Sequence, residues 1–154
     1  MIKVVVADVD GTITDYEDRL GVEALVAIRK LEDSGVKVML CSGNALCVLK
    51  ALARYMGCSG PLVAENGGVV EYKGRMHILC KAREGRKAVL RLKEKYGEKI
   101  RESWSNRYRF VDMAILRTIG YGEVVEVVKG LKGMKVMDSG FAYHIMDEAV
   151  NKGV

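Results

Sequence analysis

The chain has 154 residues, 49% hydrophobic and 29% charged, a balance typical of one globular domain or of one domain with a modest insertion. Many of the basic residues behind the net charge of +5 alternate with glutamates between Lys81 and Arg109, which favours a solvated helix face over a nucleic-acid-binding stripe. No apolar stretch approaches the roughly 20 residues that span a bilayer, and the opening MIKVVVAD is not typical of a signal peptide. We therefore expect no nucleic-acid partner and no membrane partner.

The first 65 residues alternate between apolar runs and helical spacings. Strands are expected over 2–7, 36–41 and 61–65, and helices over 22–31 and from just after Asn44 through about Tyr55. Strands that are apolar at nearly every position are typical of a parallel sheet whose faces are covered by helices. On this pattern the run VVVA at 4–7 is expected to be buried on both faces.

The pattern changes after Asn66-Gly67-Gly68, a strong hairpin signal. A second hairpin is expected around Lys73-Gly74. Beyond residue 80 the spacing predicts, in chain order, a helix, a strand, a helix and two strands, over 84–96, 108–117, 121–131, 134–138 and 141–146. Helices mixed with hairpin-linked strands indicate a small antiparallel α+β insertion.

Four cysteines, at positions 41, 47, 58 and 80, form no CxxC pair. Cys41 lies within an apolar strand, where a thiol behaves as a small hydrophobic group. We expect reduced core cysteines in a cytoplasmic protein rather than a zinc site or a disulfide framework.

Acidic and hydroxyl side chains follow the first two predicted strands. Asp8, Asp10 and Gly11 come directly after the first strand, and Ser42-Gly43 follows the second. Ligands of open parallel sheets bind at the carboxyl ends of the strands, so these side chains are expected to share one crevice. Ser42 and the Gly43 amide suit a phosphate group.

Two carboxylates this close repel each other unless a divalent cation lies between them. Mg²⁺ is the natural cation, because it takes one or two carboxylates and completes its shell with water and phosphate oxygens. Aspartate is a known nucleophile toward phosphorus, and a second carboxylate can act as general acid and base. The pattern of Asp8 and Asp10 therefore predicts phosphoryl chemistry.

The segments DVDGT, VMLCSGN and VNKG, in this order and each after the expected element, resemble motifs of the haloacid dehalogenase superfamily. An insertion placed after AENGG is similar to that of the branch containing archaeal phosphoglycolate phosphatases, with sugar phosphatases nearby. The resemblance implies an α/β fold with a Rossmann-like parallel core and an α+β cap after the third strand. It divides the chain into core (1–79), cap (80–146) and a return to the core (147–154).

The resemblance also implies roles for the motif residues. Asp8 would be the nucleophile and a magnesium ligand, and Asp10 would be the general acid and base and would coordinate the metal through its backbone carbonyl. Ser42 and the Gly43 amide would hold phosphoryl oxygens, while Lys152, near the start of an expected final helix, would neutralise them and orient Asp8. The implied partner is a small phosphorylated metabolite, with 2-phosphoglycolate as the first candidate.

One departure from the family pattern concerns the chain's last residues. Family members continue past the lysine into a helix, a strand and an acidic GD…D motif, whereas the sequence stops at Val154. We expect a core that is incomplete at the C-terminus, a partly formed metal site and a first strand left at the sheet edge, where chains can self-associate. A truncated, non-catalytic remnant that binds phosphate or a protein partner is therefore an alternative, as is a sugar-phosphate phosphatase.

Several residues also have simpler interpretations. Ser42 could be an ordinary helix N-cap, Lys152 a solvated lysine, and the Asn66 turn only a hairpin. In the insertion, three cationic or amide side chains could face a substrate carboxylate, although surface positions are more common for such residues: Asn106, Arg107 and Arg109.

Overall fold

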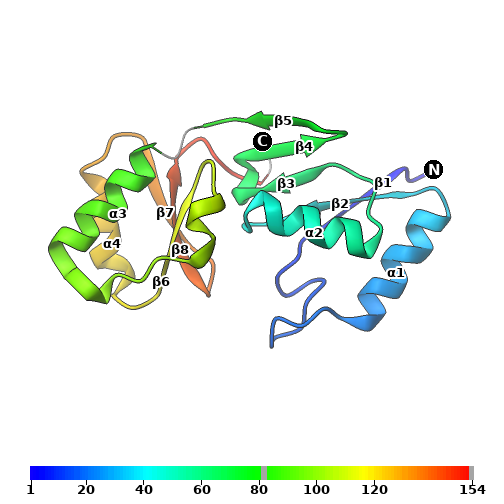
Figure 1. The fold of residues 1–154 in the computed structure, drawn as a ribbon, viewed down its shortest axis with the longest axis horizontal. Coiled ribbons are helices and arrows are strands. Elements are labelled where there is room, and N and C mark those ends of the chain that lie inside the picture. Colours follow the sequence, from blue (N-terminus) through cyan, green and yellow to red (C-terminus); the bar gives the residue numbers. More distant parts are fainter. Residues whose placement is uncertain (81–82, 153–154) are drawn as a thin grey trace. The chain divides into compact units, whose positions relative to one another are not determined.

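The computed structural model describes residues 1–80 and 83–152, drawn in Figure 1. Its internal contacts group the chain into two compact units, Met1–His77 together with Lys152–Val154, and Ile78–Asn151. Each unit carries its own sheet and its own helices. The interpretation of the second unit as a cap stays a prediction, and the two units are described in turn.

A five-stranded sheet organises the first unit, in the order β1-β2-β3-β4-β5. The β1–β2 and β2–β3 pairs are parallel and the β3–β4 pair is antiparallel. This arrangement confirms the predicted α/β class with a parallel core. The strand bounds are β1 (Val4–Ala7), β2 (Lys37–Cys41), β3 (Leu62–Ala64), β4 (Val69–Tyr72) and β5 (Arg75–Ile78).

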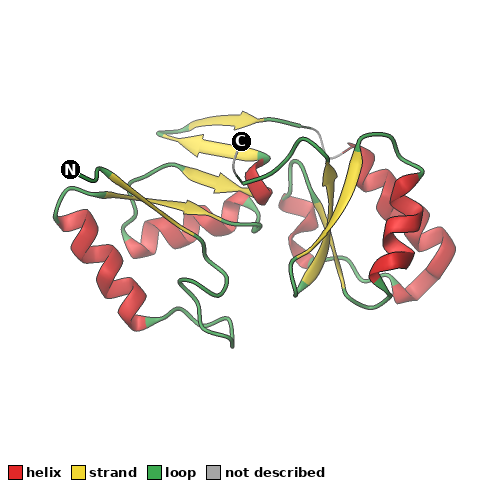
Figure 2. Ribbon diagram, turned by 180° about the vertical axis from the view of Figure 1, so that it is seen from behind, coloured by secondary structure: helices red, strands yellow, loops and turns green. Residues whose placement is uncertain are grey.

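Helices α1 (Val22–Asp33) and α2 (Leu46–Met56) lie on the same side of this sheet in both ribbon views (Figures 1 and 2). Val38 and Leu40 alternate along β2 and are fully buried, as expected for the strand face that the helices cover. Gly57 ends α2 with φ of 80°, a left-handed conformation in which a Cβ is disfavoured. Both helices lie close to where the sequence predicts them.

Strand β1 departs from the prediction that it is buried on both faces. It is at one end of the sheet order, and Val4 and Val6 are 45% and 59% exposed. The apolar pattern predicts a strand that is covered on both sides, but among the described residues β1 pairs only with β2. The expected edge position is thus observed among the described residues.

Two tight turns close the hairpins of the first unit. A short 3₁₀ turn, η1 (Glu65–Gly67), joins β3 to its antiparallel partner β4, and Lys73 and Gly74 join β4 to β5. The backbone at Lys73 and Gly74 has φ of 50° and 78°, the geometry of a type I′ hairpin. Both hairpins agree with the predicted turn signals.

The second unit has an antiparallel sheet in the order β6-β8-β7. Two helices pack on it, and their shared core includes Leu92, Val124, Ile115 and Ile145. This agrees with the predicted small α+β unit. The bounds are α3 (Arg83–Tyr96), η2 (Gly97–Lys99), η3 (Trp104–Tyr108), β6 (Met113–Leu116), α4 (Tyr121–Lys129), β7 (Met134–Asp138) and β8 (Ala142–Asp147).

Two predicted elements of this part are wrong in extent. The strand expected over 108–117 begins only at Met113, because η3 and a loop containing the buried ion pair of Arg109 and Asp112 precede it. No helix opens after Asp147 within the described residues; the chain makes a turn in which the Val150 amide donates to the Asp147 carbonyl over 3.1 Å.

All four cysteines are free, as predicted, but only Cys41 belongs to the buried core. Cys47 is exposed, and Cys58 and Cys80 are half-buried. Burial raises the pKa of the Cys58 thiol to about 11, so this thiol stays protonated near neutral pH.

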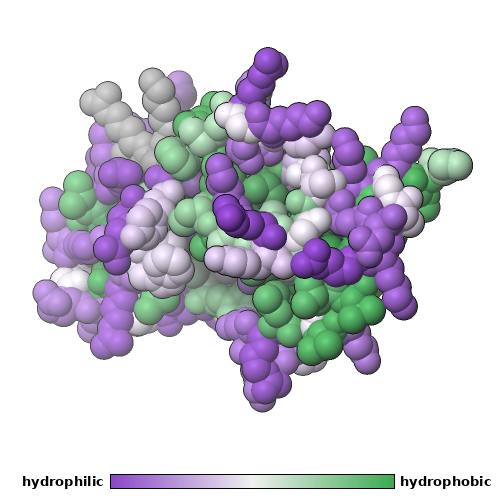
Figure 3. Space-filling view, turned by 45° about the vertical axis from the view of Figure 1, so that its right-hand side comes forward, coloured by the Kyte–Doolittle hydropathy of each residue, from purple (hydrophilic) through white to green (hydrophobic). Residues whose placement is uncertain are grey.

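The surface is mixed in character. Figure 3 shows hydrophilic side chains projecting from one face, with hydrophobic atoms exposed between them. No helix among the described residues is long and apolar enough to cross a membrane.

Candidate active site

The predicted acidic and hydroxyl residues meet at the carboxyl ends of β1 and β2. Asp8 follows the last residue of β1, and Ser42 follows the last residue of β2. These strands are parallel, with Ala7 opposite Leu40, so the residues that follow them emerge at the same end of the sheet. The crevice expected around these residues stays a prediction.

Asp8 forms an ion pair with Lys152. The Lys152 Nζ lies 2.7 Å from the Asp8 Oδ1, and the two side chains are 42% and 41% exposed. The pair joins residues 144 positions apart, so it brings the last described residue of the chain to the end of β1. A cation that contacts a carboxylate while remaining reachable from solvent can also contact an anionic ligand.

Cys41 lies beside this pair. Burial raises the pKa of its thiol, the charge of Asp8 raises it further, and the charge of Lys152 opposes both. A thiol of this kind is protonated and inert near neutral pH. Cys41 is therefore a packing residue beneath the ion pair and not a nucleophile.

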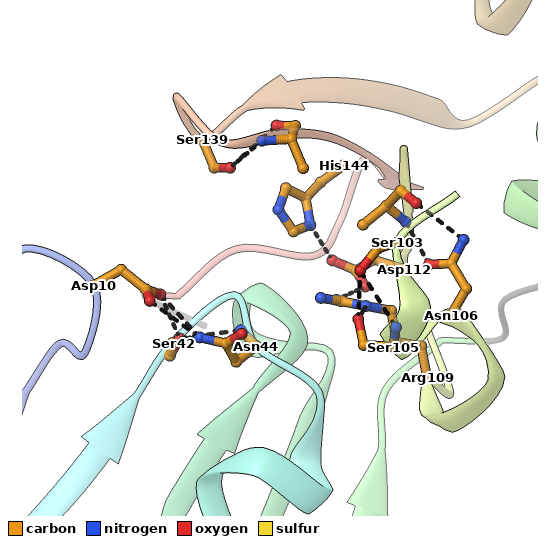
Figure 4. A network of polar contacts seen from close by, with 12 residues as sticks. Asp10, Ser42, Asn44, Ser103, Ser105, Asn106, Arg109, Asp112, Ser139 and His144 are labelled. Carbon is orange, nitrogen blue, oxygen red and sulfur yellow. Dashed lines mark hydrogen bonds and ion pairs between the residues drawn. The ribbon is translucent and has the colours of Figure 1, made fainter. Parts of the chain in front are cut away.

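Asp10 is held by the loop that follows β2, as Figure 4 shows. The Ser42 hydroxyl donates to Asp10 Oδ2 over 3.2 Å, and the Asn44 Nδ2 donates to Oδ2 over 3.0 Å and to Oδ1 over 3.3 Å. The backbone amide and the side-chain amide of Asn44 both donate to the Ser42 hydroxyl oxygen, over 3.0 and 3.1 Å. These donors all point at one carboxylate. Loops that gather donors around an anion in this way also bind phosphate oxygens.

Ser42 is not a helix N-cap. Helix α2 begins at Leu46 and its N-cap residue is Ala45, so the simpler interpretation of Ser42 is wrong. Its side chain is completely buried, its amide donates to the Val63 carbonyl over 2.9 Å, and its hydroxyl joins the loop to Asp10. The hydroxyl position is thus fixed by β3 as well as by β2.

The turn after β3 holds the loop of Ser42, Gly43 and Asn44 through backbone hydrogen bonds. The Glu65 amide donates to the Asn44 carbonyl over 3.0 Å, and the Asn66 amide donates to the Ser42 carbonyl over 3.2 Å. A Cβ added to Gly43 would lie 2.9 Å from Asn66 Oδ1, closer than real contacts allow. The turn predicted as a hairpin therefore also holds the loop, and Gly43 leaves space for the Asn66 side chain.

The loop after β1 is closed by its own backbone. The amides of Thr12, Ile13 and Thr14 all donate to the Val9 carbonyl, and the Gly11 amide donates to Thr14 Oγ1 over 3.0 Å. Gly11 has φ of 76°, which explains the glycine after the second aspartate. The buried side chain of Val9 anchors the loop between Asp8 and Asp10.

Two carboxylates are available for a cation. Among the described residues, no group of three or more His, Cys, Asp or Glu side chains gathers as a metal site would. Mg²⁺ needs only one or two protein carboxylates when water and phosphate complete its shell. Asp8 and Asp10 fit that smaller donor set by their chemistry, and a metal site at this place stays a prediction.

Two of the three candidates for anion binding in the second unit, Asn106 and Arg109, are buried. The Arg109 guanidinium pairs with Asp112 and donates to Ser105 Oγ over 3.0 Å, and the Asn106 side chain bonds the Glu102 carboxylate and the Ala114 backbone. Arg107 is exposed and lies over the Tyr108 ring at 5.3 Å. The contacts of Arg109 and Asn106 indicate structural roles.

The fold and the site together define a class: an α/β protein with paired carboxylates, a buried hydroxyl and a lysine at one end of a parallel sheet. Residues 5–103 match the family of haloacid dehalogenase-like hydrolases. The chain belongs to this family.

Within this family, the chain is similar to several archaeal proteins over nearly its whole length. The chain is 38% identical over 157 residues to a phosphoglycolate phosphatase of Methanospirillum hungatei, and 36% identical over 152 residues to one of Methanothermobacter thermautotrophicus. Each match covers 99% of this chain and 67% of the relative, so the chain spans about two thirds of their length. A solved Thermoplasma acidophilum protein superposes with a TM-score of 0.86 at 28% identity, again over 99% of this chain and 67% of that one.

Proposed function

We propose that this chain carries the nucleophile and the phosphate-binding loop of a Mg²⁺-dependent phosphatase for small phosphomonoesters. The observation that carries the proposal is the pairing of Asp8 with Lys152, next to the Asp10–Ser42–Asn44 cluster, at one end of the parallel sheet. A nucleophilic carboxylate with an adjacent cation, and a second carboxylate held by donors, are the parts that phosphoryl transfer needs.

The reaction has two displacements at phosphorus. An Asp8 carboxylate oxygen forms a bond to phosphorus while the bond to the ester oxygen breaks, and Asp10 supplies the proton that the leaving alkoxide takes. Asp10, now ionised, accepts a proton from water, the water oxygen bonds to phosphorus, and the bond to Asp8 breaks. Inorganic phosphate leaves and Asp8 is regenerated.

The remaining residues bind and orient the substrate. Ser42 and the Gly43 amide bind the phosphoryl oxygens. Lys152 neutralises the negative charge of the phosphate and orients Asp8. Asp8 and Asp10 would hold Mg²⁺, which when bound screens the repulsion between carboxylate and phosphate. Gly11 has φ of 76° in the loop after β1, and Gly43 lies close to the Asn66 side chain, so a glycine suits each of these loop positions.

The proposed substrate is 2-phosphoglycolate. Support comes from the curated relatives, which are named phosphoglycolate phosphatases and share 36–38% identity with the chain. Other phosphorylated metabolites, sugar phosphates above all, are the alternative within the same family. A side-by-side measurement of hydrolysis of 2-phosphoglycolate and glucose 6-phosphate distinguishes them by the ratio of kcat/KM.

The first prediction concerns Asp8→Asn. Hydrolysis of p-nitrophenyl phosphate with Mg²⁺ should fall by at least about a thousandfold, because an amide cannot attack phosphorus. Asp33→Asn is the matched control, since Asp33 is an exposed residue at the end of α1, and its rate should stay within about twofold of wild type. Equal rates for Asp8→Asn and the wild-type chain would remove the proposed nucleophile.

A non-catalytic anion-binding protein is the second candidate function, and the hydroxyl and amide donors of Ser42 and Asn44, which already hold one carboxylate, favour it. It requires that the wild-type chain hydrolyses neither substrate and still binds inorganic phosphate. Binding followed by ³¹P NMR, weakened in Ser42→Ala, would identify this case.

A further inference from the structure

We propose that a hollow at the amino end of β3 is a second binding site of the first unit, for a small organic acid in which a carboxylate is joined to a short apolar body. The hollow has a volume of about 290 Å³ and lies between α2, the segment that leads into β3, and the end of β4. Asp8 and Ser42 follow the carboxyl ends of β1 and β2, so the hollow lies at the opposite end of the sheet. Binding there needs none of the residues that the proposed phosphatase uses.

Part of the lining is apolar and uncharged. Ala53 of α2 and Leu62 of β3 line the hollow and are 7% and 5% exposed. Cys58 lines it too and is half-buried, and burial raises the pKa of its thiol to about 11. The thiol is therefore neutral near pH 7 and adds no negative charge. A lining of this kind favours a ligand with an apolar part that can leave water.

Two lysines of the lining have no carboxylate partner. Lys50 of α2 and Lys73 of the β4–β5 turn are exposed, and neither forms an ion pair within the part of the chain that the structure describes, whereas Lys93 of the second unit pairs with a glutamate. The Lys73 Nζ lies 5.5 Å from the centroid of the Tyr72 ring. One carboxylate, that of Glu71, also lines the hollow, so two lysines and one glutamate give the lining a net charge of +1. This charge favours an anion.

One wall of the hollow is held in place by the rest of the first unit. The Glu32 carboxylate accepts hydrogen bonds from the Ser59 amide over 2.8 Å and from the Ser59 hydroxyl over 2.7 Å. The Gly60 amide donates to the Val38 carbonyl over 3.0 Å, and a Cβ added to Gly60 would lie 2.5 Å from that oxygen. Because this wall is pre-formed, a ligand loses less free energy in ordering it.

The hydrogen bonds of the lining select the kind of anion. Phosphate sites gather backbone amides that are free to donate. The amides of Ser59, Gly60 and Gly74 all donate to other protein groups. A phosphate ester also carries a charge of about −1.5 to −2, whereas a carboxylate carries a single negative charge. The net charge of +1 therefore matches a carboxylate better than a phosphate.

The experiment titrates the purified chain with 4-fluorobenzoate and, separately, with 4-fluorobenzamide, which has a similar shape and no charge. Binding is followed by ¹⁹F NMR line widths and by amide chemical shifts of the ¹⁵N-labelled chain. We expect saturable binding of the acid, about tenfold or more tighter than that of the amide, with shift changes at Lys50, Cys58 and Lys73. Inorganic phosphate at the same concentration should not displace the acid.

Matched variants separate the effect of charge from that of shape. Lys50→Gln and Lys73→Gln should each weaken binding of 4-fluorobenzoate by about threefold or more, because each removes one positive charge. Lys129→Gln is the control at an exposed position of α4 in the second unit, and it should leave the affinity within about 1.5-fold of wild type. Glu71→Gln should tighten binding by about twofold, because it removes the opposing charge and keeps an acceptor for the Gly74 amide. A gain in affinity cannot come from a loss of folding.

Any of four results would overturn the proposal. The first is the absence of saturable binding of 4-fluorobenzoate by the wild-type chain below about 10 mM. The second is equal affinity for the acid and the amide, and the third is an equal effect of Lys50→Gln and Lys129→Gln. The fourth is displacement by phosphate with shift changes at Ser42–Asn44, which would place the probe at the candidate active site. Asp8→Asn should bind the acid as wild type does, so this test and that of the phosphatase can fail separately.

Discussion

Asn44 holds the second aspartate of the site in place. Its side-chain amide contacts both carboxylate oxygens of Asp10 and the hydroxyl of Ser42, so it fixes the relative positions of the proposed general acid and the proposed phosphate-binding hydroxyl. The sequence offered a signal for it, since Asn44 stands two residues after Ser42 in the loop already singled out. The contact between Asn44 and Asp10 could not be deduced from their spacing in the sequence.

The second prediction is that Asn44→Asp destabilises the chain by about 1 kcal/mol or more near neutral pH, because it replaces a donor beside Asp10 with a second carboxylate. The difference in melting temperature from wild type should shrink below about pH 4, where carboxylates take up protons. Asn44→Ala separates the loss of the hydrogen bonds from the repulsion, since its deficit should not vary with pH in this way. A pH-independent deficit in Asn44→Asp would argue against a direct contact with Asp10.

Gly43 provides a steric test of the same loop. Gly43→Ala should destabilise the chain by about 1–3 kcal/mol, because its methyl group would lie 2.9 Å from Asn66 Oδ1. Gly122→Ala is the control: no atom lies within 4 Å of its added Cβ, and alanine favours helix α4, so it should be neutral or stabilising. Urea unfolding measures both, and equal stabilities would show that Asn66 does not press on Gly43.

Among the elements, the loop before β6 depends on a buried charged cluster. Asp112 is fully buried between Arg109 and His144, whose Nδ1 lies 2.7 Å from Asp112 Oδ2. Burial acts to raise the pKa of the Asp112 carboxyl, but the hydrogen bond from His144 and the charge of Arg109 outweigh it and lower the pKa below its ordinary value. The cluster is fixed by residues more than thirty positions apart, so local patterns could not predict it.

The fourth prediction is that Asp112→Asn destabilises the second unit by about 3–5 kcal/mol at pH 7, because it removes the buried negative charge that pairs with Arg109 and faces His144. The pKa of Asp112 in the folded chain lies below the unfolded value of about 3.9. The stability that the Asp112 carboxylate contributes is therefore present above the unfolded pKa and is lost as the pH falls through the folded pKa. Denaturant unfolding at pH 7 and pH 3 measures it. A wild-type advantage over Asp112→Asn that stays constant as the pH falls from 7 to 3 would contradict the assigned cause.

The elements also show how far sequence patterns reach. The helices and hairpins were predictable because their signals are local: apolar spacing along α1 and α2, and turn residues at Lys73 and Gly74. The exposure of Val6 was not, because it depends on whether another segment lies beside β1. The start of β6 was missed for a related reason, since buried polar contacts of Arg109 and Asp112 replace strand pairing there.

At the scale of the whole molecule, the motif residues lie close together, while their functional roles stay a prediction. Asp8, Asp10, Ser42 and Lys152 were identified from three short motifs, and the structure places them at one end of the first unit's sheet. The supporting contacts of Asn66 and the exposure of β1 depend on tertiary packing. Their detection therefore required the structure.

The central claim is that Asp8 bonds to phosphorus, and the direct measurement is a chemical trap. The chain is incubated with 2-phosphoglycolate and Mg²⁺ and quenched with borohydride, which reduces an aspartyl phosphate to homoserine, and peptides are then mapped by mass spectrometry. The account predicts homoserine at position 8, absent without substrate and absent in Asp8→Asn. Phosphate release with Asp8 unmodified under the same quench, or with another residue reduced in its place, would contradict it.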